Sequence, residues 1–113
     1  MALKILVAED EEITLKHVLS TLEREGHEVV GEKDGRAAFD RINKDHFDLL
    51  ITDVKMPFIS GLELLEKVKE VHPDIDVMII TGFGSVGDAV DAMKRGAYDY
   101  ITKPFDLDEL VIK

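Results

Sequence analysis

Two kinds of hydrophobic pattern alternate along the chain. Short runs in which almost every residue is apolar, such as 48–52 and Asp76–Thr81, have the length and continuity of strands covered on both faces of a sheet. The segments between these runs place apolar residues three and four positions apart, which is the spacing of an amphipathic helix. The pattern therefore predicts strands at residues 3–8, around 28–30, at 48–52, 76–81 and 98–102.

The helical segments are recognised by their apolar stripes and by their ends. Gly26 and Gly96 stand where helix C-caps belong, and residues 106–109 resemble a capping box that opens a last helix. The sequence ends at Lys113 and leaves this last helix short. The stripes expected to face the core are Leu15, Val18, Leu19 and Leu22; Ala38 and Ile42; Leu64, Val68 and Val71; and Val86, Ala89, Val90 and Met93.

Strands that alternate with helices over short connections indicate βαβ units and a parallel sheet. Right-handed crossovers then place helices on both faces of the sheet. With 113 residues, the chain fits one α/β domain over residues 1–113, doubly wound around a five-stranded parallel sheet. Ligands of such open sheets bind beyond the carboxyl ends of the strands, so the residues that follow each strand are the first candidates for a binding site.

Charge and composition exclude several classes of function. The formal net charge of -10 repels nucleic-acid phosphates, and it suits a basic partner or a site that collects cations. The absence of cysteine excludes disulfides and thiol chemistry. The first twelve residues lack the pattern of a signal peptide, and no apolar run is long enough to cross a membrane. We therefore expect a cytoplasmic protein that makes no contact with membranes.

Chemically reactive side chains follow four of the five expected strands. Glu9 and Asp10 follow the first, Asp53 follows the third, Thr81 ends the fourth, and Lys103 follows the fifth. Each has an ordinary explanation when taken alone, such as a helix-terminus acid, a turn residue or a solvated lysine. In a parallel sheet, however, all of them meet at one edge.

The conjunction indicates phosphoryl chemistry. Three converging carboxylates repel one another, and a hard divalent cation such as Mg²⁺ relieves that repulsion. A carboxylate is also a nucleophile toward phosphorus, and Asp53 stands alone on the central strand. Lys103 and the Thr81 hydroxyl are candidates to hold phosphoryl oxygens, and the Lys55 backbone carbonyl is a further candidate metal ligand. The chain has no Walker A motif, so the phosphoryl group is expected to arrive on a donor.

One motif points to a different class of protein. Residues 82–87 read GFGSVG, a literal match to the G-x-G-x-x-G of dinucleotide-binding folds. That motif normally follows the first strand of its unit, and an acid at the tip of the next strand binds the ribose. Here only one strand follows, and it ends in Lys103 and Pro104. A loop after Thr81, with Ser85 and Asp88 capping the next helix, is the simpler interpretation.

Four segments together resemble the receiver domain of two-component response regulators: ILVAEDEE, DLLITDVKMPFISGLELL, VMIITGFGS and GAYDYITKPF. They cover almost the whole chain in the order and spacing of that family. The resemblance implies a flavodoxin-like (CheY-like) fold with strand order 2-1-3-4-5. It also implies Mg²⁺, with Mn²⁺ as a substitute, and phosphoryl transfer from a phosphohistidine of a sensor kinase.

The resemblance assigns roles residue by residue. It implies that Asp53 is the phosphoacceptor, and that Asp10, Asp53 and the Lys55 carbonyl hold the metal, with Glu9 nearby through water. Thr81 and Lys103 are the implied phosphoryl contacts, Tyr100 is the aromatic residue whose rotamer follows the state of the switch, and Lys103–Pro104 resembles the family's cis peptide. Two positions depart from the family pattern: Glu9 stands where Asp is commoner, and the last helix is shorter than the several turns it normally has.

The segment from Gly84 to Leu110 most resembles receivers of NtrC- and DctD-type sigma-54-dependent transcriptional activators. Those proteins carry ATPase and DNA-binding domains that this chain lacks, so any contact with DNA is expected only through an output domain. A homodimer through the fourth helix, fifth strand and last helix is expected as well. A haloacid-dehalogenase-type phosphatase would need an acid at position 55, where this chain has lysine. An unphosphorylated interaction module would usually lack Asp53 or Lys103.

Overall fold

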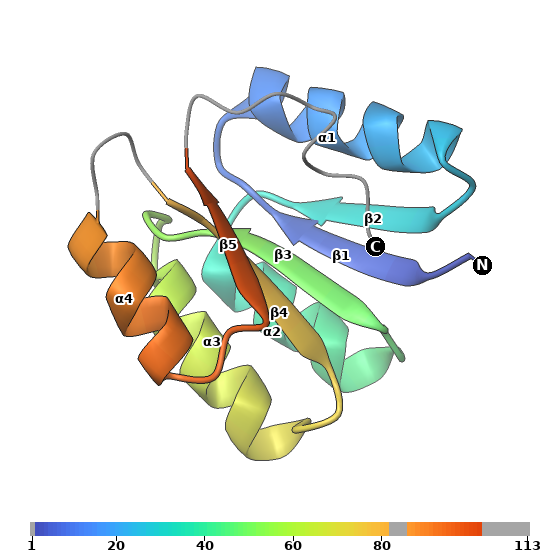
Figure 1. Ribbon diagram of the computed structural model, residues 1–113. Coiled ribbons are helices and arrows are strands. Elements are labelled where there is room, and N and C mark those ends of the chain that lie inside the picture. Colours follow the sequence, from blue (N-terminus) through green and yellow to red (C-terminus); the bar gives the residue numbers. More distant parts are fainter. Residues whose placement is uncertain (1, 82–85, 103–113) are drawn as a thin grey trace.

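The computed structural model describes residues 2–81 and 86–102, and there strands and helices alternate without exception (Figure 1). The elements in order are β1 (Lys4–Ala8), α1 (Glu12–Arg24), β2 (Glu28–Glu32), α2 (Gly35–Lys44), β3 (Leu49–Asp53), α3 (Gly61–Val71), β4 (Asp76–Thr81), α4 (Val86–Lys94) and β5 (Asp99–Thr102). The capping box expected at 106–109 and the last helix lie outside the described residues, as does Ser85.

The five strands form one parallel sheet in the order β2-β1-β3-β4-β5, which confirms the predicted topology. Helix α1 covers one face of this sheet, and α2, α3 and α4 cover the other (Figure 1). After β1 the chain runs to the face that α1 covers, whereas after β3 it runs to α3 on the opposite face. The divergence of the two connections leaves an open edge at the carboxyl ends of β1 and β3, where ligands of doubly wound sheets bind.

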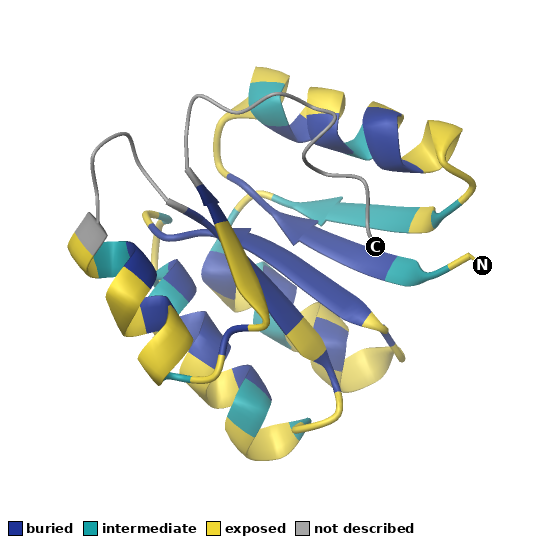
Figure 2. Cartoon of the chain, viewed as in Figure 1, coloured by how far each residue is buried: buried dark blue, intermediate teal, exposed yellow. Residues whose placement is uncertain are grey.

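The central strands are buried because both of their faces carry apolar side chains. In β1, Leu6 and Ala8 join the core shared with α2, α3 and α4, while Ile5 and Val7 join the core under α1. All four of these residues are fully buried. Full burial of an aliphatic side chain contributes roughly 1.5–3 kcal/mol, so strands of this composition are stable only between two helical layers. Figure 2 shows the buried band running through the middle of the molecule.

Some predicted boundaries and buried faces are wrong in detail. Strand β3 extends to Asp53, so this carboxylate belongs to the last residue of the strand; β1 begins at Lys4 and β5 at Asp99, each one residue later than predicted. Val90 and Met93 of α4 were expected in the core, but they are 48% and 43% exposed.

The reason lies in which residues of the helices meet the sheet. Among the side chains of α4 that the structure describes, the buried ones are those of Ala89 and Ala92, and these small side chains occupy the face that packs on the sheet. The side chain of Val86 lies outside the described part. Val71, at the last position of α3, is likewise exposed, while Leu64, Leu65 and Val68 are buried. In both helices the apolar stripe is therefore wider than the face that packs against the rest of the domain.

The helix ends follow the sequence pattern. Gly26 and Gly96 both have positive φ, +91° and +101°, just beyond the ends of α1 and α4. This confirms their prediction as C-cap glycines, since an L side chain is strained in this conformation. None of the helices in the described ranges has the length and apolar composition to span a membrane.

Candidate functional site

The register of the central strands brings two acidic positions together. Ala8 of β1 pairs with Thr52 of β3 in the parallel sheet, so the next residues, Glu9 and Asp53, emerge side by side at the carboxyl edge. Asp10 follows Glu9 directly, before α1 begins. The sheet therefore places three carboxylates from two distant parts of the chain at one point, as the sequence predicted.

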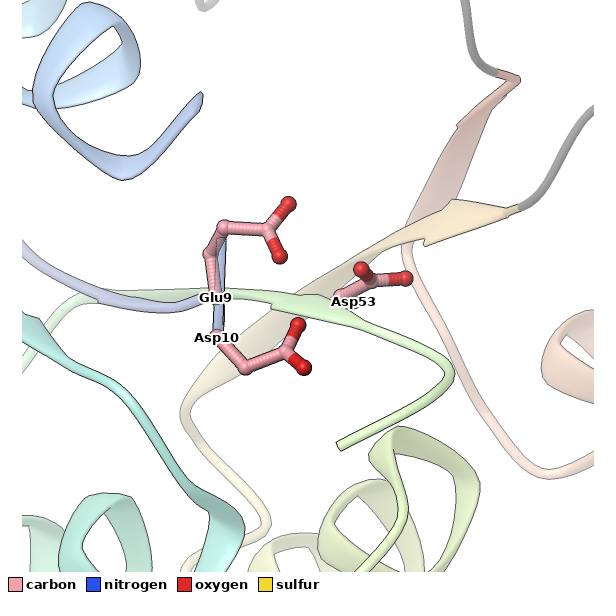
Figure 3. Close-up of side chains that lie close together, drawn as sticks. All are labelled: Glu9, Asp10 and Asp53. Carbon is pink, nitrogen blue, oxygen red and sulfur yellow. The ribbon is translucent and has the colours of Figure 1, made fainter. Parts of the chain in front are cut away.

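The three carboxylates of Glu9, Asp10 and Asp53 form a tight group, which we call the acidic cluster. They lie close enough for one carboxylate oxygen from each residue to be within 4.8 Å of the others (Figure 3). Glu9 is fully buried and Asp53 is 7% exposed, whereas Asp10 is exposed. The cluster thus has a buried floor and one side open to solvent.

Backbone groups hold the Glu9 side of the cluster in place. The Glu9 N–H donates to the Glu32 carbonyl at 3.0 Å, which extends the pairing of β1 with β2 by one residue. The Glu11 N–H donates to Glu9 Oε2 at 3.2 Å. One carboxylate oxygen of Glu9 therefore accepts a hydrogen bond from the turn that leads into α1. As a result, Glu9 offers a metal fewer coordination positions than Asp10 does.

The donor set of the acidic cluster fits a hard divalent cation. All the side-chain ligands are carboxylate oxygens, which Mg²⁺ and Mn²⁺ prefer. Clustered carboxylates in a partly buried position repel one another, and a divalent cation offsets that repulsion. One open side leaves space for the water ligands that Mg²⁺ retains.

The loop after Asp53 is fixed by a close backbone approach at Gly61. The Gly61 N–H donates to the Val54 carbonyl at 2.7 Å. A Cβ at Gly61 would lie 1.9 Å from the Asp53 carbonyl oxygen, a distance that excludes any side chain. Helix α3 then begins with a capping box in which Ser60 accepts from the Glu63 N–H. Gly61 therefore permits the sharp entry of the chain into α3. Lys55, within this loop, is exposed.

The predicted phosphoryl contacts lie partly outside the described residues. In the backbone register, Asp53 pairs with Ile80, and Thr81 is the next residue along β4. Thr81 also pairs with Thr102, the residue before Lys103. The side chain of Thr81, together with Lys103 and Pro104, lies outside the described part of the chain. Tyr100, the predicted switch residue, lies on the edge strand β5 and is 41% exposed.

Sequence reasoning missed Thr52, which lies immediately before Asp53. This residue is fully buried, and its hydroxyl donates to the Asp53 carbonyl at 3.0 Å and approaches Met56 Sδ at 3.8 Å. The side chain therefore links the end of β3 to the loop that follows it. A threonine in a strand is too common to be singled out by pattern alone.

The fold and the site together define a doubly wound α/β domain with a carboxylate cluster at the carboxyl end of its central strands. Comparison with known proteins gives the family: the chain belongs to the response regulator receiver domain family, whose pattern matches residues 5–113. Receiver domains are the phosphotransfer modules of two-component response regulators, and they generally bind Mg²⁺.

Two relatives and one solved structure illustrate the similarity. The chain is 35% identical to the response regulator receiver protein CpdR of Brucella abortus, over 96% of this chain and 90% of that protein. It is 37% identical to the DNA-binding transcriptional regulator NtrC of Azospirillum brasilense, over 97% of this chain and 23% of that protein. The crystal structure of the receiver domain of NtrX from Brucella abortus superimposes with a TM-score of 0.91 at 38% identity, covering 95% and 91% of the two chains.

These matches confirm the predicted receiver family and its resemblance to NtrC-type receivers. The chain spans about a quarter of the length of several curated relatives that it matches.

Proposed function

We propose that Asp53 accepts the phosphoryl group from a phosphohistidine of a sensor kinase. The observation that carries this proposal is the position of Asp53 at the end of the central strand, with two further carboxylates beside it. A carboxylate oxygen of Asp53 forms the new bond to phosphorus while the bond from phosphorus to the histidine nitrogen breaks, and the departing imidazole retains the electron pair. The same site slowly hydrolyses the aspartyl phosphate.

The acidic cluster supports a metal-assisted version of this transfer. Asp10, Asp53 and the Lys55 carbonyl are the proposed ligands of Mg²⁺, with Glu9 acting through water and Mn²⁺ as a substitute. When bound, the cation would neutralise the charge of the phosphoryl oxygens and orient them. Thr81 and Lys103 are proposed to hold the remaining oxygens, and the Lys103–Pro104 peptide is proposed to be cis.

Labelling with a small phosphodonor tests the nucleophile. Acetyl phosphate with Mg²⁺ is expected to add one phosphoryl group to the parent chain, measured by intact-protein mass spectrometry. Asp53→Asn should abolish this labelling, because the amide is not a nucleophile toward phosphorus. Asp48→Asn, just before the opposite end of the same strand, is the matched control and should label like the parent. Equal labelling of Asp53→Asn and the parent would show that the assignment is wrong.

Phosphorylation is proposed to switch the surface formed by α4 and β5. Thr81 moves toward the phosphoryl group, Tyr100 fills the space it leaves, and the populations of two arrangements shift. Val90 and Met93 on α4 and Tyr100 on β5 are exposed. Figure 2 shows exposed segments on both of these elements. This exposure supports a homodimer through α4, β5 and the last helix. We propose that the switch regulates a transcriptional output domain outside residues 1–113, and that the protein affects DNA only through this domain. The proposed location is the cytoplasm, without contact with membranes.

A further inference from the structure

Phe58, five residues after Asp53, has a backbone conformation that is unfavourable for its type. Its φ is +69°, and in the described part of the chain it is the one residue other than glycine with positive φ. The Ile59 N–H donates to the Pro57 carbonyl at 2.8 Å across Phe58, which makes Phe58 the centre of a γ-turn. A γ-turn with positive φ is rare and strained, and a bulky side chain there is an outlier.

The ring of Phe58 gains little from burial in return. The residue is 70% exposed, so its backbone strain is not offset by packing in the core. Its neighbour Ile59 does pack against the core under α2 and α3. The turn thus holds the aromatic ring outward while the next side chain points inward.

The contact that the Phe58 ring does make is with Arg36, at the beginning of α2. The guanidinium carbon of Arg36 lies 4.5 Å from the ring centroid, which is the geometry of a cation–π contact. Gly35 permits this approach, because a Cβ there would lie 2.2 Å from the Ile59 carbonyl oxygen. The connection after β2 and the connection after β3 are therefore pressed together beside the acidic cluster's edge of the sheet.

Arg36 is also placed against a local electrostatic preference. The N-terminal turn of a helix favours negative charge, which at α2 comes from the N-cap Asp34, and Arg36 places a positive charge in that first turn. Within the described residues, the Arg36 side chain has no ion pair, although the chain carries a net charge of -10. A stacked guanidinium keeps its N–H edges available for a carboxylate.

The backbone strain of Phe58 and the positive charge of Arg36 at a helix N-terminus meet at one exposed point, near the edge of the sheet that holds Asp53. Unfavourable features of this kind concentrate at functional sites. Resting on the function proposed above, we propose that Phe58 and Arg36 form a docking anchor for the phosphohistidine-bearing surface of the sensor kinase. The donor must approach Asp53 at this edge of the sheet. The complementary surface on the donor would present an apolar side chain to the Phe58 ring. Beside it, a carboxylate would pair with Arg36, the cation that stacks on that ring. On a chain with a net charge of -10, a cation at this point specifies the orientation of a partner that is basic elsewhere.

The test separates docking from chemistry by using two phosphodonors. The protein donor is the autophosphorylated sensor kinase of the source organism that labels the parent chain fastest, and the small donor is acetyl phosphate. Phe58→Gly and Arg36→Gln are expected to lower the second-order rate constant with the kinase about tenfold, the size of a hot-spot loss. Their labelling by acetyl phosphate should stay within about twofold of the parent. Arg36→Lys, which keeps the charge and loses the planar stack, should be intermediate.

Matched controls and a second variant keep the outcome interpretable. Tyr98→Ala removes an exposed aromatic residue at the opposite edge of the sheet, and Arg24→Gln removes a cation near the far end of α1; both should accept phosphate from the kinase like the parent. Glycine and asparagine tolerate positive φ, so Phe58→Gly or Phe58→Asn should melt at or above the temperature of the parent.

Two results would overturn the anchor. One is transfer from the kinase to Phe58→Gly and Phe58→Asn at the rate of the parent. The other is an equal loss with both donors, which would place the ring in the chemistry of the site. Failure of the proposed function looks different, because then Asp53→Asn would be labelled by acetyl phosphate as well as the parent is.

Discussion

At the scale of single residues, Gly61 is the position near the site that is least able to accept a larger side chain. Gly61→Ala places a Cβ 1.9 Å from the Asp53 carbonyl oxygen, so the loop that follows Asp53 must move. We expect a loss of about 2–3 kcal/mol in the free energy of unfolding, the cost of overpacking, together with slower labelling by acetyl phosphate. Urea denaturation measures the first effect and mass spectrometry the second.

The same substitution elsewhere in the chain serves as the control. Gly87 lies in α4, and a Cβ there meets no atom within 4 Å. Gly87→Ala should therefore stabilise the protein by about 0.5–1 kcal/mol, because alanine favours the helix. An equal loss of stability in both variants would contradict the role given to the close approach at Gly61.

Asp10 is the acid of the cluster that is best placed to govern metal affinity. It is exposed, while the buried Glu9 already accepts a backbone hydrogen bond. Asp10→Ala should weaken Mg²⁺ binding at least about tenfold, and Glu9→Gln should weaken it less. Isothermal titration calorimetry measures both affinities, with Asp40→Ala on the outer surface of α2 as the control. Unchanged affinity in Asp10→Ala would exclude the proposed metal ligands.

The residues of the acidic cluster could be predicted from the sequence, and Phe58 could not. Glu9, Asp10 and Asp53 each follow an apolar run, and a parallel sheet brings the ends of such runs to one edge. Phe58 gives no such signal, because nothing in its neighbours indicates a positive φ at a bulky residue. Its conformation arises from a tertiary contact, the seating of Ile59 against Gly35.

At the scale of elements, the capping box of α3 stabilises the helix that follows the loop after Asp53. The Ser60 side chain accepts from the Glu63 N–H at 3.2 Å, and the Glu63 side chain accepts from the Ser60 N–H in return. Ser60→Ala should lower the free energy of unfolding by about 1 kcal/mol, whereas Ser60→Asp should retain most of it. Thermal denaturation followed by circular dichroism checks the pair, and a loss of equal size in both would argue against a capping role.

An ion pair between β1 and the end of α2 gives stability a defined dependence on pH. Lys4 Nζ lies 2.9 Å from Asp45 Oδ1. The hydrogen bond from Lys4 lowers the pKa of Asp45, and the hydrogen bond to Asp45 raises the pKa of Lys4. The Asp45 contribution is therefore present above the usual carboxyl pKa and is lost as pH falls through the lowered value. The Lys4 contribution is present below 10.5 and is lost as pH rises through the raised value.

Asp45→Asn tests this linkage. Its melting temperature should be slightly lower than that of the parent near pH 7, and the difference should close as the pH approaches about 2, where both forms lack the charge. The effect is small because both side chains are accessible to solvent. A difference that stays constant from pH 7 to pH 2 would show that the pair contributes through packing rather than charge.

The elements themselves could be predicted more reliably than their buried faces. Continuous apolar runs can be accommodated only between two layers, so β1, β3 and β4 were predictable from sequence to within one or two residues. A stripe of apolar residues on a helix leaves more freedom. Val90 and Met93 continue the stripe of α4, but the sheet edge that α4 covers is too narrow to bury them.

At the scale of the whole molecule, those exposed side chains predict self-association. Val90→Glu should weaken dimerisation at least about tenfold in whichever phosphorylation state the dimer forms, because a carboxylate in an apolar interface is costly to desolvate. Light scattering after size exclusion, with and without acetyl phosphate and Mg²⁺, measures this. Val71→Glu, on the exposed end of α3, is the control and should behave like the parent. A parent chain that stays monomeric in both states would rule out the proposed dimer.

The order of strands in the sheet also determines when the centre of the sheet can form during synthesis of the protein. Ile5 of β1 pairs with Leu49 of β3, a separation of 44 residues, and the central pairing cannot form before residue 49 has been made. At ribosomal rates of roughly 5–20 residues per second, β1 waits about 2–9 seconds for its inner partner. Throughout that interval the apolar segment Ile5–Ala8 lacks its inner neighbour, so its apolar side chains stay available for unwanted contacts in the nascent chain.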